Sequence, residues 1–265
     1  TNMPGGVAAG LTNEPSVINL YKPVVMTGRA KLDASNQLNR SVALIGDSKG
    51  VVNAEKKVTA LGYSSIVALA QNNGVVNAAK DIIAKDKVTA LGYSSIVALA
   101  QNNGVVNAAK DIIAKDGAAA KDDATKPYLY NNIGAYAGVN GKVNVAGNAD
   151  IYGIGAMASG ANAVANLNGS ANTIRTGKSG ALVATNGGRV NFGGGTITHS
   201  ENEAKDHDSS TPFNADSSSR INFTGTTTLN ISHGILIPGT ANDYAAAALT
   251  SPGITGTAKY TGMSN

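Results

Sequence analysis

Three aspartates recur along the chain in a way that could place carboxyl groups together. Asp81, Asp111 and Asp150 each stand next to an isoleucine. Two carboxyl groups held about 5 to 9 Å apart in a cleft would be the arrangement that hydrolyses glycosidic bonds. The regular recurrence of these aspartates is most typical of an outward-facing position in a repeating structure. The chain also has no tryptophan that could stack on a sugar ring. We therefore expect a solvated face here and not a catalytic pair.

A polar segment at residues 199–219, HSENEAKDHDSSTPFNADSSS, gathers the second set of candidates. His199, Glu201, His207 and Asp208 have the donors of a metal site but no recognisable ligand spacing. We expect neither a metal nor a cofactor, and no serine nucleophile motif surrounds these histidines or His233. The segment is predicted to be an inserted loop, and such loops often carry binding. Its candidate recognition residues are His199, Glu201, Glu203, Lys205, His207 and Asp208.

The third set is aromatic. Residues 116–132, DGAAAKDDATKPYLYNN, form a second predicted insertion that includes Tyr128 and Tyr130, and Tyr136 follows soon after. Tyrosine rings are suited to contacts with proteins or glycans because they are apolar with one polar tip. Packing of these rings back onto the rest of the protein is the alternative that the sequence leaves open.

An exact sequence repeat indicates which structural elements position these residues. KVTALGYSSIVALAQNNGVVNAAKDIIAKD occupies residues 57–86 and again residues 87–116. A closed core has no room for a second copy because its interior is already packed. An open stack of layers simply gains one layer. The duplication therefore predicts a solenoid, and in such a stack the second copy adds one coil in register.

Degraded copies of the same unit extend over most of the chain. The unit has an apolar segment, a turn rich in Asn and Gly, and then a β-branched residue, an asparagine and another apolar residue. Its asparagine recurs at Asn19, Asn53, Asn77, Asn107, Asn144, Asn166, Asn191 and Asn222. Variable gaps between constant units are expected of a solenoid with insertions. We predict a structural ladder, with each asparagine at a turn and donating its amide to the asparagine of the next coil.

Helix and strand compete in the perfect repeat. VVNAAKDIIAKD has apolar residues close to one helical face, so a short helix is an alternative there. Later copies such as VNVAGNADIYGIG, VNFGGGTITH and INFTGTTTLNIS are rich in glycine and β-branched residues, which favours strands. Asn-Gly and Gly-Gly pairs are predicted to supply positive φ at the corners. The fold class is therefore all-β, a parallel β-helix of about nine coils spanning residues 1–265, with residues 247–260 starting one more layer.

Composition narrows the possible partners. The chain has no cysteine, and no apolar run approaches the length of a membrane span. Its net charge of +4 comes from residues 1–126, which hold 14 Lys and Arg against 10 Asp and Glu, while residues 127–265 hold 7 against 7. A basic patch for nucleic acid would be clustered and interleaved with aromatics, whereas these charges alternate with acids. We expect no nucleic-acid partner.

Units such as SGALVATNGGRVNFGGGTI, in a cysteine-free array, resemble the passenger domains of type V autotransporters, especially the large fusobacterial outer-membrane adhesins. The resemblance covers residues 41–198 and 220–260. It implies a right-handed β-helix displayed on the cell surface for adhesion, as a segment of a larger passenger tethered through a C-terminal barrel outside this chain. Implied partners are surface proteins or glycans of host or bacterial cells. A carbohydrate-active enzyme and a laterally self-associating rod are the alternatives.

Overall fold

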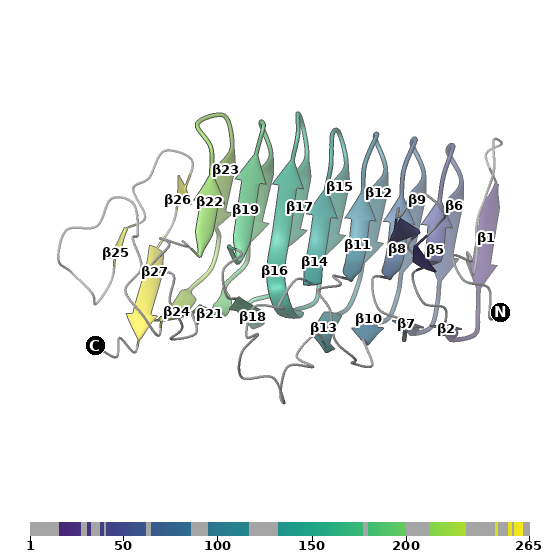
Figure 1. The fold of residues 1–265 in the computed structure, drawn as a ribbon, viewed down its shortest axis with the longest axis horizontal. Helices are drawn as coiled ribbons and strands as arrows, with labels where there is room; N and C mark the ends of the chain where they lie inside the picture. Colours follow the sequence, from purple (N-terminus) through teal and green to yellow (C-terminus); the bar gives the residue numbers. More distant parts are fainter. Residues whose placement is uncertain are drawn as a thin grey trace.

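The computed structural model describes residues 16–27, 31–32, 38–39, 41–61, 65–85, 95–116, 132–176, 180–199, 212–231, 247–248, 254–255 and 257–261. These ranges contain strands, turns and bends and no helix, so none of them holds a helix able to cross a bilayer. The strands stack along one long axis, each beside its counterpart in the coil before and after it (Figure 1). The chain is thus a parallel β-helix, as the sequence predicts.

The coils contribute strands to three faces, which we call A, B and C in the order in which most coils visit them. Face B carries β1 (Val17–Leu20), β6 (Val51–Ala54), β9 (Val75–Ala78), β12 (Val105–Ala108), β15 (Lys142–Val145), β17 (Val164–Leu167), β20 (Arg189–Phe192), β23 (Arg220–Phe223) and β26 (Ile254–Thr255). This nine-stranded sheet has one strand from each coil, which confirms the predicted number of about nine coils. Because β26 pairs with β23, the tail does form a further layer.

Faces C and A complete the coils. Face C carries β2 (Val24–Met26), β7 (Val58–Ala60), β10 (Ile82–Lys85), β13 (Ile112–Asp116), the first half of β16 (Ala149–Ser159), β18 (Asn172–Thr176), β21 (Gly195–His199), β24 (Thr227–Ile231) and β27 (Thr257–Thr261). Face A carries β5 (Val42–Gly46), β8 (Ile66–Ala70), β11 (Ile96–Ala100), β14 (Asn132–Ala137), the second half of β16, β19 (Leu182–Thr185) and β22 (Phe213–Ala215). The remaining short strands pair antiparallel, β3 (Lys31–Leu32) with β4 (Leu38–Asn39) and β25 (Ala247–Ala248) with β27.

The identical repeats stack residue on residue. Ile66 pairs with Ile96, Val75 with Val105, and Ile82 with Ile112. The second copy therefore adds one coil in register, as predicted. The segment VVNAAKDIIAKD forms β9 and β10, so its helical alternative is wrong: backbone pairing with the neighbouring coils decides its conformation.

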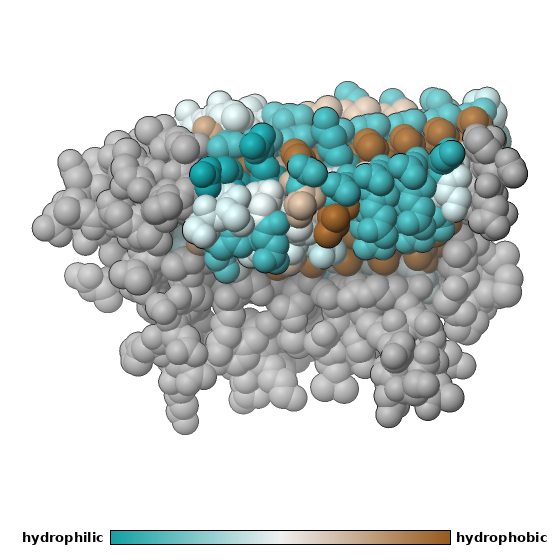
Figure 2. Space-filling model, turned by 90° about the horizontal axis from the view of Figure 1, so that it is seen from above, coloured by the Kyte–Doolittle hydropathy of each residue, from teal (hydrophilic) through white to brown (hydrophobic). Residues whose placement is uncertain are grey.

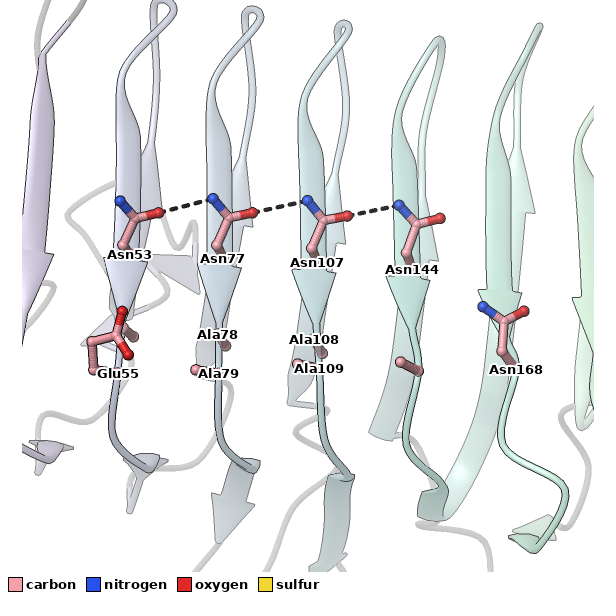
Figure 3. A pocket seen from close by; sticks show the side chains of 12 residues that line it. Asn53, Glu55, Asn77, Ala78, Ala79, Asn107, Ala108, Ala109, Asn144 and Asn168 are labelled. Atoms are coloured by element: carbon pink, nitrogen blue, oxygen red, sulfur yellow. Dashed lines mark hydrogen bonds between the residues drawn. The ribbon is translucent and has the colours of Figure 1, made fainter.

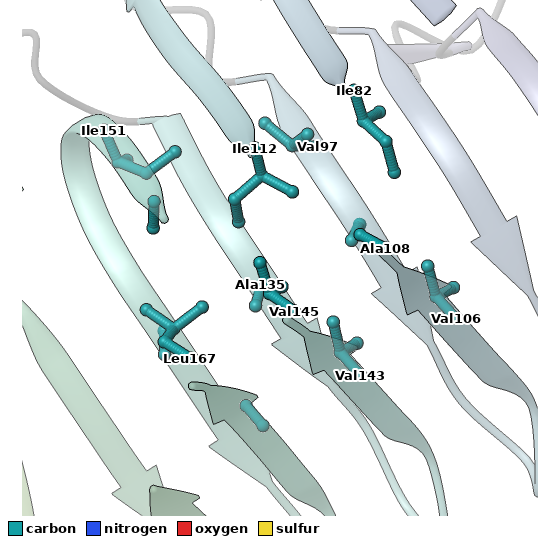
Figure 4. Close-up of a cluster of buried hydrophobic side chains, with 14 of the residues drawn as sticks. Ile82, Val97, Val106, Ala108, Ile112, Ala135, Val143, Val145, Ile151 and Leu167 are labelled. Carbon is teal, nitrogen blue, oxygen red and sulfur yellow. The ribbon is translucent and has the colours of Figure 1, made fainter. Parts of the chain in front are cut away.

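The core is filled by columns of aliphatic side chains, one from each coil. Figure 4 shows part of it, with Val106 and Val143 in one column and Ala108, Val145 and Leu167 in the next. This second column grows from alanine to Phe192 and Phe223 toward the C-terminal coils. All three phenylalanines of the chain meet there, with ring centroids 5.9 Å apart for Phe192 and Phe223 and 5.0 Å apart for Phe213 and Phe223.

The two predicted insertions both lie between a strand of face C and the next strand of face A. Residues 117–131 join β13 to β14 and lie outside the described ranges. The insertion predicted at residues 199–219 is shorter than expected, because 213–215 form β22 and 216–219 make the next corner. Phe213 explains the difference: the residue is 4% exposed and packs in the core, so it returns the chain to the coil. Both insertions thus attach along one edge of the rod.

Candidate binding groove

A row of asparagines runs along the outer side of face B. In each neighbouring pair, Nδ2 of the later residue donates to Oδ1 of the earlier one over 2.6 to 2.9 Å. The row consists of Asn19, Asn53, Asn77, Asn107, Asn144, Asn166, Asn191 and Asn222. These are the residues predicted to form a ladder, and we keep that name for the row. It ends where Asn222 pairs with Thr255.

Two details of the predicted ladder are wrong. Each asparagine is the third residue of its strand, as in β6 and β9, and does not stand at a turn. Its side chain also donates to the preceding coil, not to the following one. A strand position needs no left-handed backbone, so the asparagine is used here for its paired donor and acceptor and not for turn formation.

Left-handed backbone is found instead at the tight corners between faces A and B. Asn72, Asn73 and Asn140 have φ of 50°, 64° and 54°. The glycines that follow serve mainly a different need, since a Cβ on Gly74 or Gly141 would lie 2.1 Å from a carbonyl oxygen of the preceding coil. In these Asn-Gly pairs the asparagine therefore adopts the positive φ that was predicted for the corner, and the glycine allows the close approach of the preceding coil. Figure 2 looks down on this side of the rod and shows a largely hydrophilic surface along it.

Carboxylates reinforce two of these corners. Burial alone raises the pKa of Asp47, but hydrogen bonds from Gln71, Asn72 and Ser48 outweigh it and hold this pKa below its usual range. Asp216 accepts hydrogen bonds from the backbone N–H of Asn186 and the hydroxyl groups of Ser219 and Ser218, which hold its pKa well below the usual range. Both carboxylates tie adjacent coils together at the corner.

Beside the ladder lies a shallow groove of about 400 Å³ that crosses several coils. Its wall is formed by ladder asparagines from Asn53 to Asn144 and its floor by alanines (Figure 3). The floor residues stand two positions after each ladder asparagine, where Ala79, Ala109 and Ala146 follow one another in successive coils. Glu55 and Asn168 occupy the same position in the coils on either side. The groove exists because three small side chains stand between two larger ones.

A column of lysines follows the groove at the corner between faces B and C. Lys22, Lys56, Lys80 and Lys110 stand three positions after a ladder asparagine in four successive coils, and all four are exposed. Gly147 takes the next place, where a Cβ would lie 2.4 Å from the carbonyl carbon of Lys110. The column is therefore confined to the N-terminal coils.

The three recurrent aspartates do not form one column. Asp81 and Asp111 share the position after the lysines, where Nζ of Lys57 lies 3.9 Å from Asp81 and the backbone N–H of Asn148 donates to Asp111. Asp150 pairs in register with Ile113 inside face C and makes an ion pair with Lys115. Its hydrogen bond raises the pKa of Lys115. The prediction that Asp150 belongs to the same column as Asp81 and Asp111 rested on the isoleucine that follows each of them. It is wrong for Asp150, because the local sequence does not determine the register between coils.

Few of the predicted recognition residues fall where the structure describes side chains. Tyr136 does: it packs in a small apolar cluster on face A, in register with Leu99. His199 ends β21, and only its backbone is described. Tyr128, Tyr130, Glu201, Glu203, Lys205, His207, Asp208 and His233 lie outside the described residues. Among the described residues, no group of three or more His, Asp or Glu side chains is arranged to hold a metal ion.

The chain was also compared with known proteins. No protein-family model, no curated protein and no solved structure matches it. Any assignment of function therefore depends on the residues and geometry described above.

Sequence reasoning missed the groove and the lysine column. The sequence does contain a signal for both features. The floor alanines stand two residues after a ladder asparagine, and the lysines stand three residues after one. Aligning the copies on that asparagine places alanine under alanine and lysine under lysine.

Proposed function

We propose that this chain is a segment of a surface-displayed bacterial adhesin. The β-helix acts as a stiff stalk, and its repetitive face or its inserted loops bind proteins or glycans of host or bacterial cells. The observation that supports this most is the outer side of face B, where coil after coil presents the same side chain at the same step. A surface of this kind makes many weak contacts at once, and linked contacts raise the overall affinity.

The arrangement of the stalk fits this role. Each coil covers the backbone edge of the one before it, so the rod can extend without a closed centre. The insertions attach along a single edge, which is how solenoids commonly carry binding loops. We propose further that the segment belongs to a type V autotransporter passenger and is held at the outer membrane by a part of the protein outside this chain.

A carbohydrate-active enzyme is the rival proposal, and the aspartates weigh against it. Asp81 is paired with Lys57, Asp111 accepts a backbone hydrogen bond, and Asp150 is paired with Lys115 in a different column. Each of these carboxylates has a partner in the coil stack, and none of them lines the groove.

Bead adhesion tests the proposed function. Beads coated with the 265-residue chain are expected to be retained under flow on a layer of epithelial cells or of bacteria, and albumin-coated beads are not. Retention no greater than that of albumin on both layers would reject the adhesin proposal. Release of reducing sugar ends from a panel of polysaccharides, lost in the Asp81→Asn/Asp111→Asn/Asp150→Asn variant, would support the enzyme instead.

A further inference from the structure

The lysine column concentrates positive charge beside the groove. Successive coils lie about 4.8 Å apart, and like charges that repeat at such a spacing repel one another. Lys22, Lys56, Lys80 and Lys110 stand at the corner just beyond face B strands that pair in register, so they follow one another from coil to coil. Neither of the two ion pairs found among the described residues involves any of them. This repulsion would be relieved by an anionic ligand that lies along the column.

Nearby acids offset this charge only in part. Asp81 is engaged by Lys57, whereas Asp111 accepts the neutral backbone N–H of Asn148 and keeps its negative charge. Glu55 stands at one end of the groove, before the alanine floor begins. The stretch from Ala79 to Ala146 thus has a neutral floor, with Lys80 and Lys110 directly following the first two floor alanines.

The ladder supplies neutral hydrogen-bonding groups on the other side of the groove. A side-chain amide has two N–H donors and an oxygen with two lone pairs. Within the ladder, Asn77 and Asn107 each use one donor and one acceptor. The second donor and the second lone pair of each remain for a ligand. These two coils can therefore each offer one donor and one acceptor to hydroxyl groups.

We propose that this groove binds an anionic polysaccharide chain that lies along the rod axis. Ladder amides bind its hydroxyl groups, alanines pack against its ring faces, and Lys56, Lys80 and Lys110 contact its carboxylate or sulfate groups. The proposal rests on the adhesin function proposed above and names the ligand class of its repetitive face.

Two other macromolecules fit the groove less well. Single-stranded nucleic acids bind largely through bases stacked on aromatic side chains, and the residues that line the groove are Asn, Ala and Glu. A protein partner usually needs about 800 Å² of contact with buried anchor residues, and an alanine floor offers no pocket for an anchor. A chain of hydroxyl groups and negative charges matches the donors, acceptors and cations that are present.

The expected binding is multivalent and weak at each step. An exposed ion pair contributes at most about 1 kcal/mol, so affinity must accumulate over several coils. Because exposed charges are screened within about 8 Å at physiological ionic strength, the affinity should fall steeply as salt is raised.

Binding of defined polymers to the immobilised 265-residue chain tests the proposal. Heparin oligosaccharides or polygalacturonate are expected to bind, and neutral dextran is not. The Lys80→Ala/Lys110→Ala variant should bind about ten-fold more weakly, since two exposed ion pairs are lost. Lys142→Ala, which removes an exposed lysine from the first position of β15, is the matched control and should leave affinity unchanged. Asp81→Asn, which frees Lys57, should strengthen binding.

A second variant separates the groove from general charge attraction. Ala109→Leu fills the floor without changing any charge and should weaken binding, with circular dichroism confirming that the fold is kept. An unchanged affinity in Ala109→Leu, equal losses in Lys80→Ala/Lys110→Ala and Lys142→Ala, or equally tight binding of dextran or of poly(dT) would overturn the proposal. If beads coated with the unchanged chain adhere to cells while these polymers fail to bind, only the ligand class is rejected. If beads coated with the unchanged chain do not adhere, the adhesin function itself is rejected.

Discussion

Asn107 donates to Asn77 and accepts from Asn144, whereas Asn19 accepts from Asn53 and is the first member of the ladder. The direction of donation gives the two positions different requirements. A carboxylate can only accept hydrogen bonds. Asn107→Asp would therefore place two acceptor oxygens against each other, while Asn19→Asp would retain the hydrogen bond that Asn19 accepts.

We expect Asn107→Asp to lower the free energy of unfolding by about 1–3 kcal/mol, the usual cost of a lost and unsatisfied hydrogen bond. Asn19→Asp should cost much less. Urea unfolding at pH 7 followed by circular dichroism measures both. Equal destabilisation by the two variants would show that the direction of the ladder has no energetic weight.

Asp216 makes the stability of one corner depend on pH. Its pKa is lowered in the folded chain by the N–H of Asn186 and by hydroxyl groups, so its contribution is present above the unfolded pKa of about 3.9 and is lost as pH falls toward the folded value. Asp216→Asn should destabilise the protein at pH 7, and the difference from the unchanged chain should shrink below about pH 4. Urea midpoints at pH 7 and pH 3 measure this.

Ser217→Ala is the matched control for Asp216→Asn. It changes the same corner without removing a hydrogen bond that Asp216 is known to accept. Its effect should be the same at both pH values. A difference between Asp216→Asn and the unchanged chain that grows on acidification would contradict the assignment.

The asparagine ladder could be predicted from the sequence because its spacing persists through every insertion. Its direction could not, because the sequence of a strand does not say to which neighbour an amide will turn. Asp150 was misplaced for a related reason: register between coils is set by backbone pairing, which aligns it with Ile113 and leaves Asn148 opposite Asp111.

Among the elements, the tight corners between faces A and B depend on how closely two coils approach. A Cβ on Gly104 would lie 2.1 Å from the carbonyl oxygen of Ala70 in the preceding coil. At Gly187, in a corner farther along the rod, the nearest atom would be 3.6 Å away, but φ is +85°. Steric exclusion acts at the first glycine and backbone strain at the second.

Gly104→Ala should therefore destabilise the protein by about 3 kcal/mol, the upper range for overpacking. Gly187→Ala should cost about 1–2 kcal/mol, the penalty for placing an L-residue in left-handed backbone. Thermal unfolding of the two variants under the same conditions gives the ranking. The opposite order would mean that coil spacing at this corner relaxes easily.

Element boundaries inside the perfect repeat were harder to predict than its existence. Val58–Ala60 form β7 in the first copy, yet the face C strand of the next coil is β10, Ile82–Lys85, which pairs with β7. The same three-residue sequence at residues 88–90 lies outside the described residues. The identity of the two copies predicted that each forms one layer. It did not predict which of the two β-forming segments in a copy, VTA or IIAK, supplies the face C strand of a coil.

For the whole molecule, stacking in register predicts that coils can be removed as units. Deleting residues 87–116 joins Asp86 to Gly117 and leaves one copy of the repeat, so that the strands of the next coil can pair with β8, β9 and β10, whose residues match those of β11, β12 and β13. The shortened chain should fold, with circular dichroism unchanged in shape. In small-angle scattering its rod should be shorter by about 4.8 Å, the spacing of one coil.

Deleting only residues 87–101 is the control for this experiment. It removes β11 while keeping β12 and β13, so faces B and C would keep a layer that face A lacks. A stack without a closed centre tolerates the loss of a whole layer but not of a third of one, because each strand covers the backbone edge of its neighbour on the same face. The deletion of residues 87–101 should therefore lose cooperative unfolding, while the deletion of residues 87–116 should keep it with a reduced unfolding free energy. Loss of folding in both variants would show that the two identical coils are not interchangeable layers.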